Sequence, residues 1–195
     1  MFYNFAIVFV RIIMLFCFRV RREGIENIPA EGGVILAVKH RSNLDPVMTG
    51  ITCPRRLTFM AKSELFKNPI FGRLITALGA FPVHRGKGDI GAVKSAFSIL
   101  KSGRVMLIFP EGRRVNKNEI SKAQPGVAMI AQHTKAPVIP VYIDGDYKWM
   151  HKITVRYGDA VNLDEYYGKK LSIEELRKVS GEILDKINGL KNNDA

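Results

Sequence analysis

The sequence predicts an α/β domain with a mostly parallel central sheet flanked by helices, preceded by an amphipathic N-terminal helix. Short apolar runs rich in β-branched residues alternate with segments whose apolar residues recur every three or four positions, which is typical of parallel strands covered by helices. The chain of 195 residues lies within the range of a single domain, and its first segment is almost wholly apolar. We expect residues 1–22 to form the N-terminal helix and residues 23–195 to form the α/β domain.

The N-terminal run from Phe2 to Phe18 is interrupted only by Asn4 and Arg11. A helix of this run is about 25 Å long, short of the roughly 30 Å hydrocarbon core of a bilayer. On a helical projection Asn4, Arg11 and Arg22 fall on one line, which favours a helix lying in the membrane interface with its following arginines near lipid headgroups. A buried core helix and a single marginal span stay open as alternatives.

The strands are predicted from short apolar runs and the helices from three-and-four spacing. Asp89 is expected near the N-cap of one helix, and Ser172 with Glu175 forms a capping box at the start of the last helix. The apolar face of that last helix comprises Ile173, Leu176, Ile183, Ile187 and Leu190. In chain order we expect strands at 34–38, 57–61, 80–83, 105–109, 138–143 and 153–157, and helices at 69–78, 89–101, 126–134 and after Ser172.

The composition restricts the partners and the compartment. Lys plus Arg number 30 against 18 Asp plus Glu, a net charge of +12, and 47 % hydrophobic residues exclude a disordered basic tail. Such an excess is matched by an anionic lipid surface, a nucleic acid or a phosphorylated substrate, and a solvated basic surface is the plainer alternative. Two cysteines, Cys17 and Cys53, are too few for a disulfide framework or a cysteine zinc site, which favours a reducing compartment.

Polar residues follow the predicted strand at 34–38, where chemistry gathers in parallel sheets. His40 comes directly after this strand, and Asp45 follows five positions later, before Pro46. A turn between strand and helix lets the Asp45 carboxylate orient the imidazole and stabilise the imidazolium that forms when His40 takes a proton. The alternative is that Asp45 only caps a helix and His40 lies on the surface.

Two further polar clusters follow strands. The segment Gly79 to Arg85 and the segment Phe109 to Arg114 each place arginine just past a short apolar run, and arginine presents a fork of donors suited to phosphate oxygens. Glu111 beside Gly112 places a carboxylate on a tight turn, where it can accept hydrogen bonds from hydroxyl groups. Solvated loop charges are the alternative for each cluster.

Taken together, these segments resemble the glycerolipid acyltransferase family. His40 and Asp45 match its His-x4-Asp signature, and Phe109-Pro110-Glu111-Gly112 followed by Arg114 resembles its Phe-Pro-Glu-Gly-Thr-Arg signature. Residues 79–85 match the second block of the family and residues 138–141 the fourth, so the matches run in family order over more than half of the chain. One departure is Arg113, which stands where the family has threonine.

The resemblance implies a bacterial-type 1-acylglycerol-3-phosphate acyltransferase in which His40 is the general base on the 2-hydroxyl of lysophosphatidic acid and Asp45 orients it. The acyl donor is a thioester, acyl-CoA or acyl carrier protein, used as a co-substrate with no cofactor and no metal. The substrate-binding residues that it implies are Lys62, Arg85 and Arg114 for the phosphate and Glu111 and Gly112 for the glycerol. Beside these, we expect Lys122 to add positive potential near the phosphate and the amides near Ser42 and Asn43 to face the oxyanion.

The N-terminal helix and the basic charge, together with this resemblance, predict a peripheral or monotopic protein on the cytoplasmic face of the cell membrane, in contact with an anionic membrane surface and with no nucleic acid. Glycerol 3-phosphate or another lysophospholipid is the alternative acceptor. A serine acyl-enzyme through Ser42 is disfavoured because the chain has no Gly-x-Ser-x-Gly. A metalloenzyme is disfavoured because there is no His-Glu-x-x-His, and a basic nucleic-acid- or membrane-binding protein without catalysis is the non-enzyme alternative.

Overall fold

The structure is a computed structural model that describes residues 2–83, 90–116 and 121–192. Its strands are β1 (Arg19–Glu23), β2 (Val34–Val38), β3 (Leu57–Lys62), β4 (Ala80–Val83), β5 (Val105–Ile108), β6 (Val138–Asp144) and β7 (Lys152–Tyr157). Its helices are α1 (Phe2–Cys17), α2 (Asp45–Thr52), α3 (Pro69–Ala77), α4 (Ile90–Lys101), α5 (Gly126–Thr134) and α6 (Ile173–Gly189). Short 3-10 turns are η1 (Ile25–Asn27), η2 (Ser63–Phe66), η3 (Asp164–Tyr166) and η4 (Leu190–Asn192).

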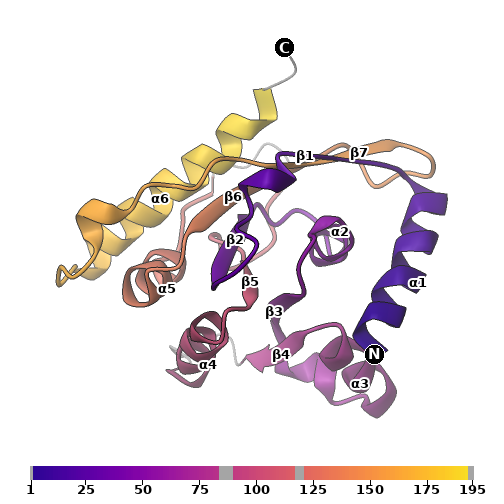
Figure 1. Ribbon diagram of the computed structural model, residues 1–195, viewed down its shortest axis with the longest axis horizontal. Helices are drawn as coiled ribbons and strands as arrows, with labels where there is room; N and C mark the ends of the chain where they lie inside the picture. Colours follow the sequence, from indigo (N-terminus) through magenta and orange to yellow (C-terminus); the bar gives the residue numbers. More distant parts are fainter. Residues whose placement is uncertain (1, 84–89, 117–120, 193–195) are drawn as a thin grey trace.

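The described strands form one sheet in the order β1-β7-β6-β2-β5-β3-β4 (Figure 1). The five strands from β6 to β4 run parallel to one another, whereas β7 pairs antiparallel with β6 and β1 pairs parallel with β7. The mostly parallel sheet flanked by helices that the sequence predicts is therefore confirmed, with two strands of opposite direction at one edge.

Helices cover both faces of this sheet, α4, α5 and α6 on one side and α1 and α2 on the other (Figure 1). Strand β2 shows why: all five of its residues are buried, and they alternate between the two cores. Val34, Leu36 and Val38 point into the core under α1 and α2, and Ile35 and Ala37 point into the core under α4 to α6. A strand buried on both faces reads as a continuous apolar run, which is why it is readable from sequence.

The N-terminal segment differs from the expectation in its extent. The helix ends at Cys17, and residues 19–23 form the edge strand β1 rather than continuing as helix. Pairing with β7 and an ion pair of 3.0 Å between Arg156 Nε and Glu23 Oε2 hold this strand in the sheet. Arg22 therefore does not extend the polar line of the helix. No helix in the described part of the chain combines the length and the apolar character needed to cross a bilayer.

The last helix begins as predicted. Ser172 Oγ accepts a hydrogen bond from the Glu175 amide, and the Glu175 carboxylate accepts one from the Ser172 amide. Leu176, Ile183 and Ile187 are buried on its inner face, but Ile173 is exposed because the first residue of the helix lies beyond the packed surface. Asp89, expected near the start of α4, lies outside the described residues.

The sheet positions the predicted site residues at one edge. His40 follows the end of β2, Glu111 follows the end of β5, and Lys62 is the last residue of β3. Strand β5 lies between β2 and β3, and all three are parallel, so their carboxyl ends meet at the same edge.

Candidate active site

A histidine and an aspartate face each other at this edge. His40 Nδ1 lies 3.1 Å from Asp45 Oδ2, and the two residues are 8 % and 1 % exposed. Because a carboxylate only accepts hydrogen bonds, this contact places the ring proton on Nδ1 and leaves Nε2 as the basic nitrogen. This is the tautomer that a general base needs when its second nitrogen faces a substrate hydroxyl.

Backbone amides fix the Asp45 carboxylate before it meets the imidazole. The amides of Arg41 and Ser42 both donate to Asp45 Oδ2, at 2.6 Å each. Asp45 is the first residue of α2 and its N-cap is Leu44, so its side chain turns back onto the preceding loop instead of capping the helix. The Ser42 amide is thus already engaged by Asp45, in contrast to the expected role at an oxyanion.

The ring of His40 is held on its flat side by Phe109. The two ring centroids are 3.8 Å apart with planes inclined by 16°. The backbone contributes as well, since the Val115 amide donates to the His40 carbonyl at 2.8 Å. Neighbouring strands β2 and β5 therefore bring the two halves of the site into direct contact.

Glu111 lies in the same turn, 3 % exposed, and neither of its carboxylate oxygens has a hydrogen-bond partner. Burial raises the pKa of Glu111 above its ordinary value of 4.5. Gly112 follows with a φ of 67° and donates its amide to the Phe109 carbonyl at 3.0 Å, which closes the turn. An unsatisfied buried carboxylate beside the imidazole is suited to accept hydrogen bonds from a polyhydroxyl ligand.

The residues expected to bind phosphate do not all line one hollow. An open hollow is lined by Glu111, Gly112, Arg113, Lys122 and Gln124. Arg113 and Lys122 thus lie at this hollow, whereas Arg114 is exposed next to it and is not among the lining residues.

Two other residues were expected to bind phosphate, Lys62 and Arg85, and the structure describes only the first of them. Lys62 is exposed at the end of β3, opposite Val83 in the register with β4. Arg85 lies outside the described residues.

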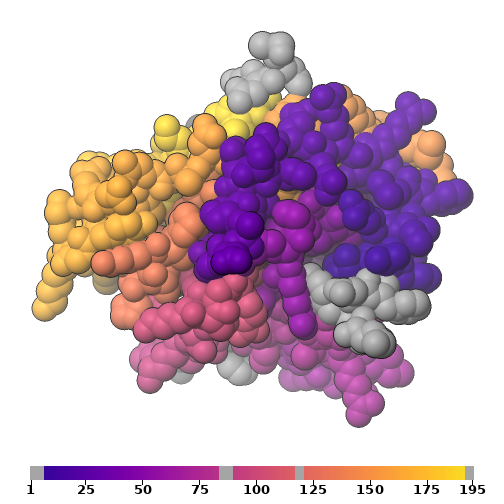
Figure 2. Space-filling view, in the orientation of Figure 1, coloured from indigo at the N-terminus to yellow at the C-terminus, as the bar shows by residue number. Residues whose placement is uncertain are grey.

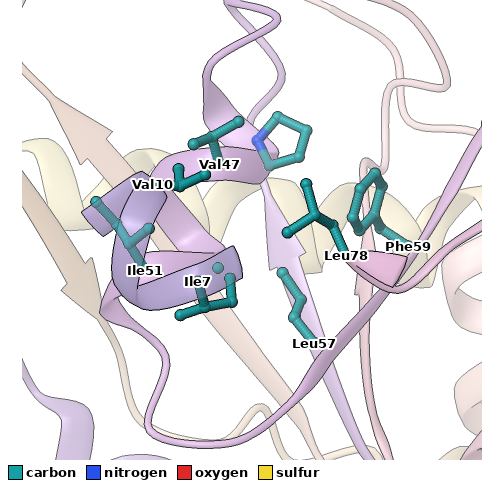
Figure 3. Close-up of a pocket in the computed structure, with 9 residues that line it drawn as sticks. Ile7, Val10, Val47, Ile51, Leu57, Phe59 and Leu78 are labelled. Carbon is teal, nitrogen blue, oxygen red and sulfur yellow. The ribbon is translucent and has the colours of Figure 1, made fainter. Parts of the chain in front are cut away.

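An apolar cavity of about 80 Å³ opens beside the first turn of α2 (Figure 3). Pro46, directly after Asp45, is part of its wall. Figure 3 shows side chains from α1, α2, β3 and the end of α3 converging on it. Its lining consists of Ile7, Val10, Pro46, Val47, Gly50, Ile51, Leu57, Phe59 and Leu78.

Sequence reasoning missed two contacts of the site. The Tyr147 hydroxyl donates to Asp45 Oδ1 at 2.8 Å, although 102 residues separate them. Arg41 joins the same two segments, since its Nη2 donates to the carbonyls of Ile143 and Gly145 at 3.0 and 2.9 Å. Nothing in the local sequence points to Tyr147, but Phe109 stands inside a recognisable motif and its contact with His40 follows once β2 and β5 are paired.

Within residues 2–83, 90–116 and 121–192, no three His, Cys, Asp or Glu side chains are grouped so that they could hold a metal ion. His40 and Asp45 are hydrogen-bonded to each other.

The fold and this site belong to a known family. The family model described as Acyltransferase matches residues 19–144, which include β1, the His40–Asp45 pair and the Glu111 turn. The chain therefore belongs to the acyltransferase family.

Two curated relatives with the same name are similar to more than half of this chain. The chain is 35 % identical over 121 residues to a 1-acyl-sn-glycerol-3-phosphate acyltransferase of Bacillus subtilis, covering 62 % of this chain and 60 % of the relative. It is 34 % identical over 155 residues to an enzyme of the same name from Streptococcus pneumoniae, covering 78 % of this chain and 55 % of the relative. The chain thus spans three fifths or less of the length of these two relatives.

A solved structure is similar over most of the chain. The 1-acyl-sn-glycerophosphate acyltransferase of Thermotoga maritima superposes with a TM-score of 0.68 at 28 % identity, covering 90 % of this chain and 73 % of that one. This likeness supports the order and direction of the strands described above.

Proposed function

We propose that the protein transfers a fatty acyl group from a thioester donor to the 2-hydroxyl of 1-acylglycerol 3-phosphate, which gives phosphatidic acid for phospholipid biosynthesis. The observation that carries the proposal is the His40–Asp45 pair at 3.1 Å, with Asp45 held by two amides and a tyrosine hydroxyl. The names of the two bacterial relatives supply the substrate class.

The pair supplies a base for the attack of the hydroxyl and an acid for the departure of the thiol. His40 Nε2 takes the proton of the acceptor hydroxyl while the oxygen attacks the thioester carbonyl carbon. The C–S bond then breaks, and the departing thiolate takes the proton from the imidazolium, so atoms and charge balance. Asp45 stabilises the imidazolium in between, and general-base assistance of this kind contributes roughly 10²- to 10⁴-fold in rate.

We assign the lysophosphatidic acid acceptor to the basic residues near the carboxyl ends of β3 and β5. Glu111 and Gly112 contact the glycerol hydroxyl region, and the buried carboxylate gains the hydrogen bonds that it lacks in the free protein. Arg114, with Lys62 and Arg85, binds the phosphate in this proposal, and Lys122 adds positive potential from the hollow beside Glu111. Arginine forms paired hydrogen bonds to phosphate, which favours a phosphorylated acceptor.

The apolar cavity beside Asp45 is suited to part of an acyl chain. Its wall begins at Pro46, next to the catalytic pair, and its lining is almost wholly aliphatic and aromatic. An acyl chain placed there brings its carbonyl toward His40. Acyl-CoA and acyl carrier protein both present such a chain as a thioester, and both are donors in this proposal.

The N-terminal helix carries the membrane proposal. Val10, Met14 and Cys17 pack inward, whereas Phe9 and Phe16 are among the apolar residues exposed on its outer face. A helix with this distribution, in a chain of net charge +12, is suited to lie in the interface of an anionic bilayer. We place the protein peripherally on the cytoplasmic face of the cell membrane, where its lipid acceptor and product reside.

The proposal is tested with the full-length protein purified in detergent. Lysophosphatidic acid, glycerol 3-phosphate and a neutral lysophospholipid are offered as acceptors, each with acyl-CoA and with acyl carrier protein as donor. We expect lysophosphatidic acid to have the highest kcat/KM and the product to carry the new ester at the 2-position. Preference for glycerol 3-phosphate contradicts the acceptor assignment, and salt-dependent DNA binding without acyl transfer contradicts the enzyme assignment.

A further inference from the structure

Exposed apolar side chains are concentrated on one side of the molecule. Among the described residues, twelve of the fourteen large apolar side chains that are exposed lie on α1, on η2 and α3, or in the loop between β6 and β7. The other two are Ile90 and Ile173. The twelve are Val8, Phe9, Ile12, Ile13, Leu15 and Phe16 of α1, Leu65, Ile70, Phe71 and Leu74 around α3, and Trp149 and Met150 of the loop.

Helix α3 carries apolar side chains on its outer side as well as on the side that packs against the domain. Asn68 caps it by accepting from the amides of Ile70 and Phe71, at 3.1 and 3.0 Å, so the helix start is well defined. Gly72 and Ile75 face inward, whereas Ile70, Phe71 and Leu74 face outward and Ile70 is 83 % exposed. A surface helix of a soluble domain ordinarily presents polar residues on that side.

The three segments form a continuous surface. Helix α3 contacts α1, and Figure 2 shows the two on the same side of the molecule. Near the other end of α1, the Phe16 and Trp149 rings meet edge to face at 5.5 Å, and the Met150 amide donates to the Cys17 carbonyl at 2.7 Å. Helix α1 thus bridges α3 and the loop between β6 and β7.

Positive charge lies beside this apolar surface. Lys67 precedes α3, Arg73 lies on it, and Arg11 lies on α1, all three exposed. Exposed apolar residues combined with basic side chains match a bilayer of anionic lipids, where the apolar groups enter the acyl boundary and the cations face the headgroups. A protein partner has no comparable need for both.

We propose that α3 is a second membrane-contacting element, which inserts Ile70, Phe71 and Leu74 into an anionic bilayer beside α1. The inference rests on the membrane contact proposed for α1 and extends it. Leu78, directly after α3, and Ile7 and Val10 of α1 line the apolar cavity. Contact at both helices therefore holds the cavity toward the acyl chains of the membrane.

The test compares binding of full-length variants to vesicles of phosphatidylglycerol and phosphatidylethanolamine in equal parts. The double variant Ile70→Ser and Leu74→Ser is expected to bind at least about tenfold more weakly than wild type. The control Ile173→Ser, at a side chain 62 % exposed on the distant α6, is expected to bind as wild type does. Because the replaced side chains face solvent, we expect both proteins to unfold at the wild-type temperature.

Separate outcomes distinguish this inference from the proposals on which it rests. Wild-type binding by the α3 variant overturns it, even if the α1 variant Ile12→Ser and Phe16→Ser binds weakly. Weaker binding by the control Ile173→Ser to the same degree also overturns it. Acyl transfer in detergent is expected to be unchanged in the α3 variant. If the wild type itself shows no acyl transfer, that result contradicts the proposed function and leaves the inference about vesicle binding standing.

A second inference comes from an independent contact in the site. Asp45 Oδ2 is held by His40 and two amides, whereas Oδ1 accepts its hydrogen bond from Tyr147 at 2.8 Å. The Tyr147 ring packs edge to face on Phe18, with centroids 5.9 Å apart. Burial, followed by the charge of Asp45, raises the pKa of the Tyr147 hydroxyl, so it stays a donor throughout the range of an assay.

We infer that Tyr147 is a positioning residue that acts on His40 through Asp45. Its hydroxyl fixes the rotation of the Asp45 carboxylate about the Cβ–Cγ bond. This rotation sets the direction of the hydrogen bond between Asp45 Oδ2 and His40 Nδ1. The inference rests on the proposed role of His40 as the base.

Tyr147→Phe tests the inference, with Tyr166→Phe as the matched control. The Tyr166 hydroxyl also donates to a carboxylate, at 3.2 Å. That carboxylate belongs to Glu182 of α6, which covers the face of the sheet opposite to α2. We expect Tyr147→Phe to lower kcat about tenfold with KM for both substrates unchanged, the effect of losing one hydrogen bond to a charged group. The control is expected to leave kcat unchanged.

The variant Asp45→Asn separates positioning from general loss of structure. In that background Tyr147→Phe is expected to cause no further fall in kcat, because the carboxylate through which it acts is gone. An unchanged kcat in Tyr147→Phe alone, or an equal fall in both backgrounds, overturns the inference. Full activity of His40→Ala instead contradicts the proposed function from which the inference starts.

Discussion

Replacing Asp45 by asparagine removes a negative charge while nearly keeping the shape of the side chain. Asp45 Oδ2 lies 3.1 Å from His40 Nδ1. When His40 takes the substrate proton, the two opposite charges attract by about 5 kcal/mol at an effective dielectric constant of roughly 20. About 1.4 kcal/mol corresponds to tenfold in rate, so the full loss approaches about 10⁴-fold, the upper end of what general-base assistance contributes.

The fold is expected to survive this change. The asparagine oxygen still accepts the amide protons of Arg41 and Ser42, which Asp45 Oδ2 accepts in the wild type. We therefore expect kcat for acyl transfer to lysophosphatidic acid, followed by thiol release, to fall about 10²- to 10⁴-fold while KM changes little. Asp185→Asn, at an exposed position of α6, is the matched control. A fall in kcat of less than about fivefold, in a variant that unfolds at the wild-type temperature, refutes the reasoning.

Three further predictions concern the walls of the site. Because burial raises the pKa of Glu111, the wild type loses stability as pH rises above 4.5 through the raised pKa. Glu111→Gln should therefore unfold at a higher temperature at about pH 8 while differing less at about pH 5, and parallel melting profiles contradict this. Arg114→Gln should raise KM for lysophosphatidic acid about tenfold, and a larger effect of Arg113→Gln transfers the phosphate contact to that residue. Gly50→Leu fills the apolar cavity, because a Cβ at Gly50 meets side-chain atoms on two sides at 3.8 Å; it should shift the donor preference to shorter acyl chains, and an unchanged chain-length profile contradicts the cavity's role.

Much of the fold was readable from sequence because most strands are short apolar runs. The central strand Val34–Val38, buried on both faces, and the edge strand Ala80–Val83 have the expected bounds, and Ser172 and Glu175 form the expected capping box. The edge strand β1 was not readable, since its sequence Arg-Val-Arg-Arg-Glu is polar and its partner β7 lies more than a hundred residues away. Its place in the sheet depends on pairing and on the Glu23–Arg156 ion pair, neither of which has a local signature.

The candidate site also combines contacts between residues close in sequence with contacts between distant segments. The approach of Asp45 to His40 is local, within one turn between strand and helix, so the spacing permitted it and the family resemblance selected it over a helix cap. The contact from Tyr147 depends on how the loop after β6 returns to α2, which the Arg41 hydrogen bonds fix. The exposure of Arg114 beside the hollow, with Arg113 lining it, is set by the side-chain directions within a single turn, which spacing does not specify.

The assignment of His40 as the base is tested most directly by comparing His40→Ala with His133→Ala in acyl transfer to lysophosphatidic acid. The two histidines share the same ring contact, because each ring stacks on a phenylalanine with planes inclined by 16°, His40 on Phe109 and His133 on Phe97. The proposed role of His40 as the base predicts that kcat falls at least about 10²-fold in His40→Ala and stays at the wild-type value in His133→Ala. Near-normal turnover by His40→Ala, in a protein that unfolds at the wild-type temperature, contradicts the assignment of the base and with it the proposed mechanism.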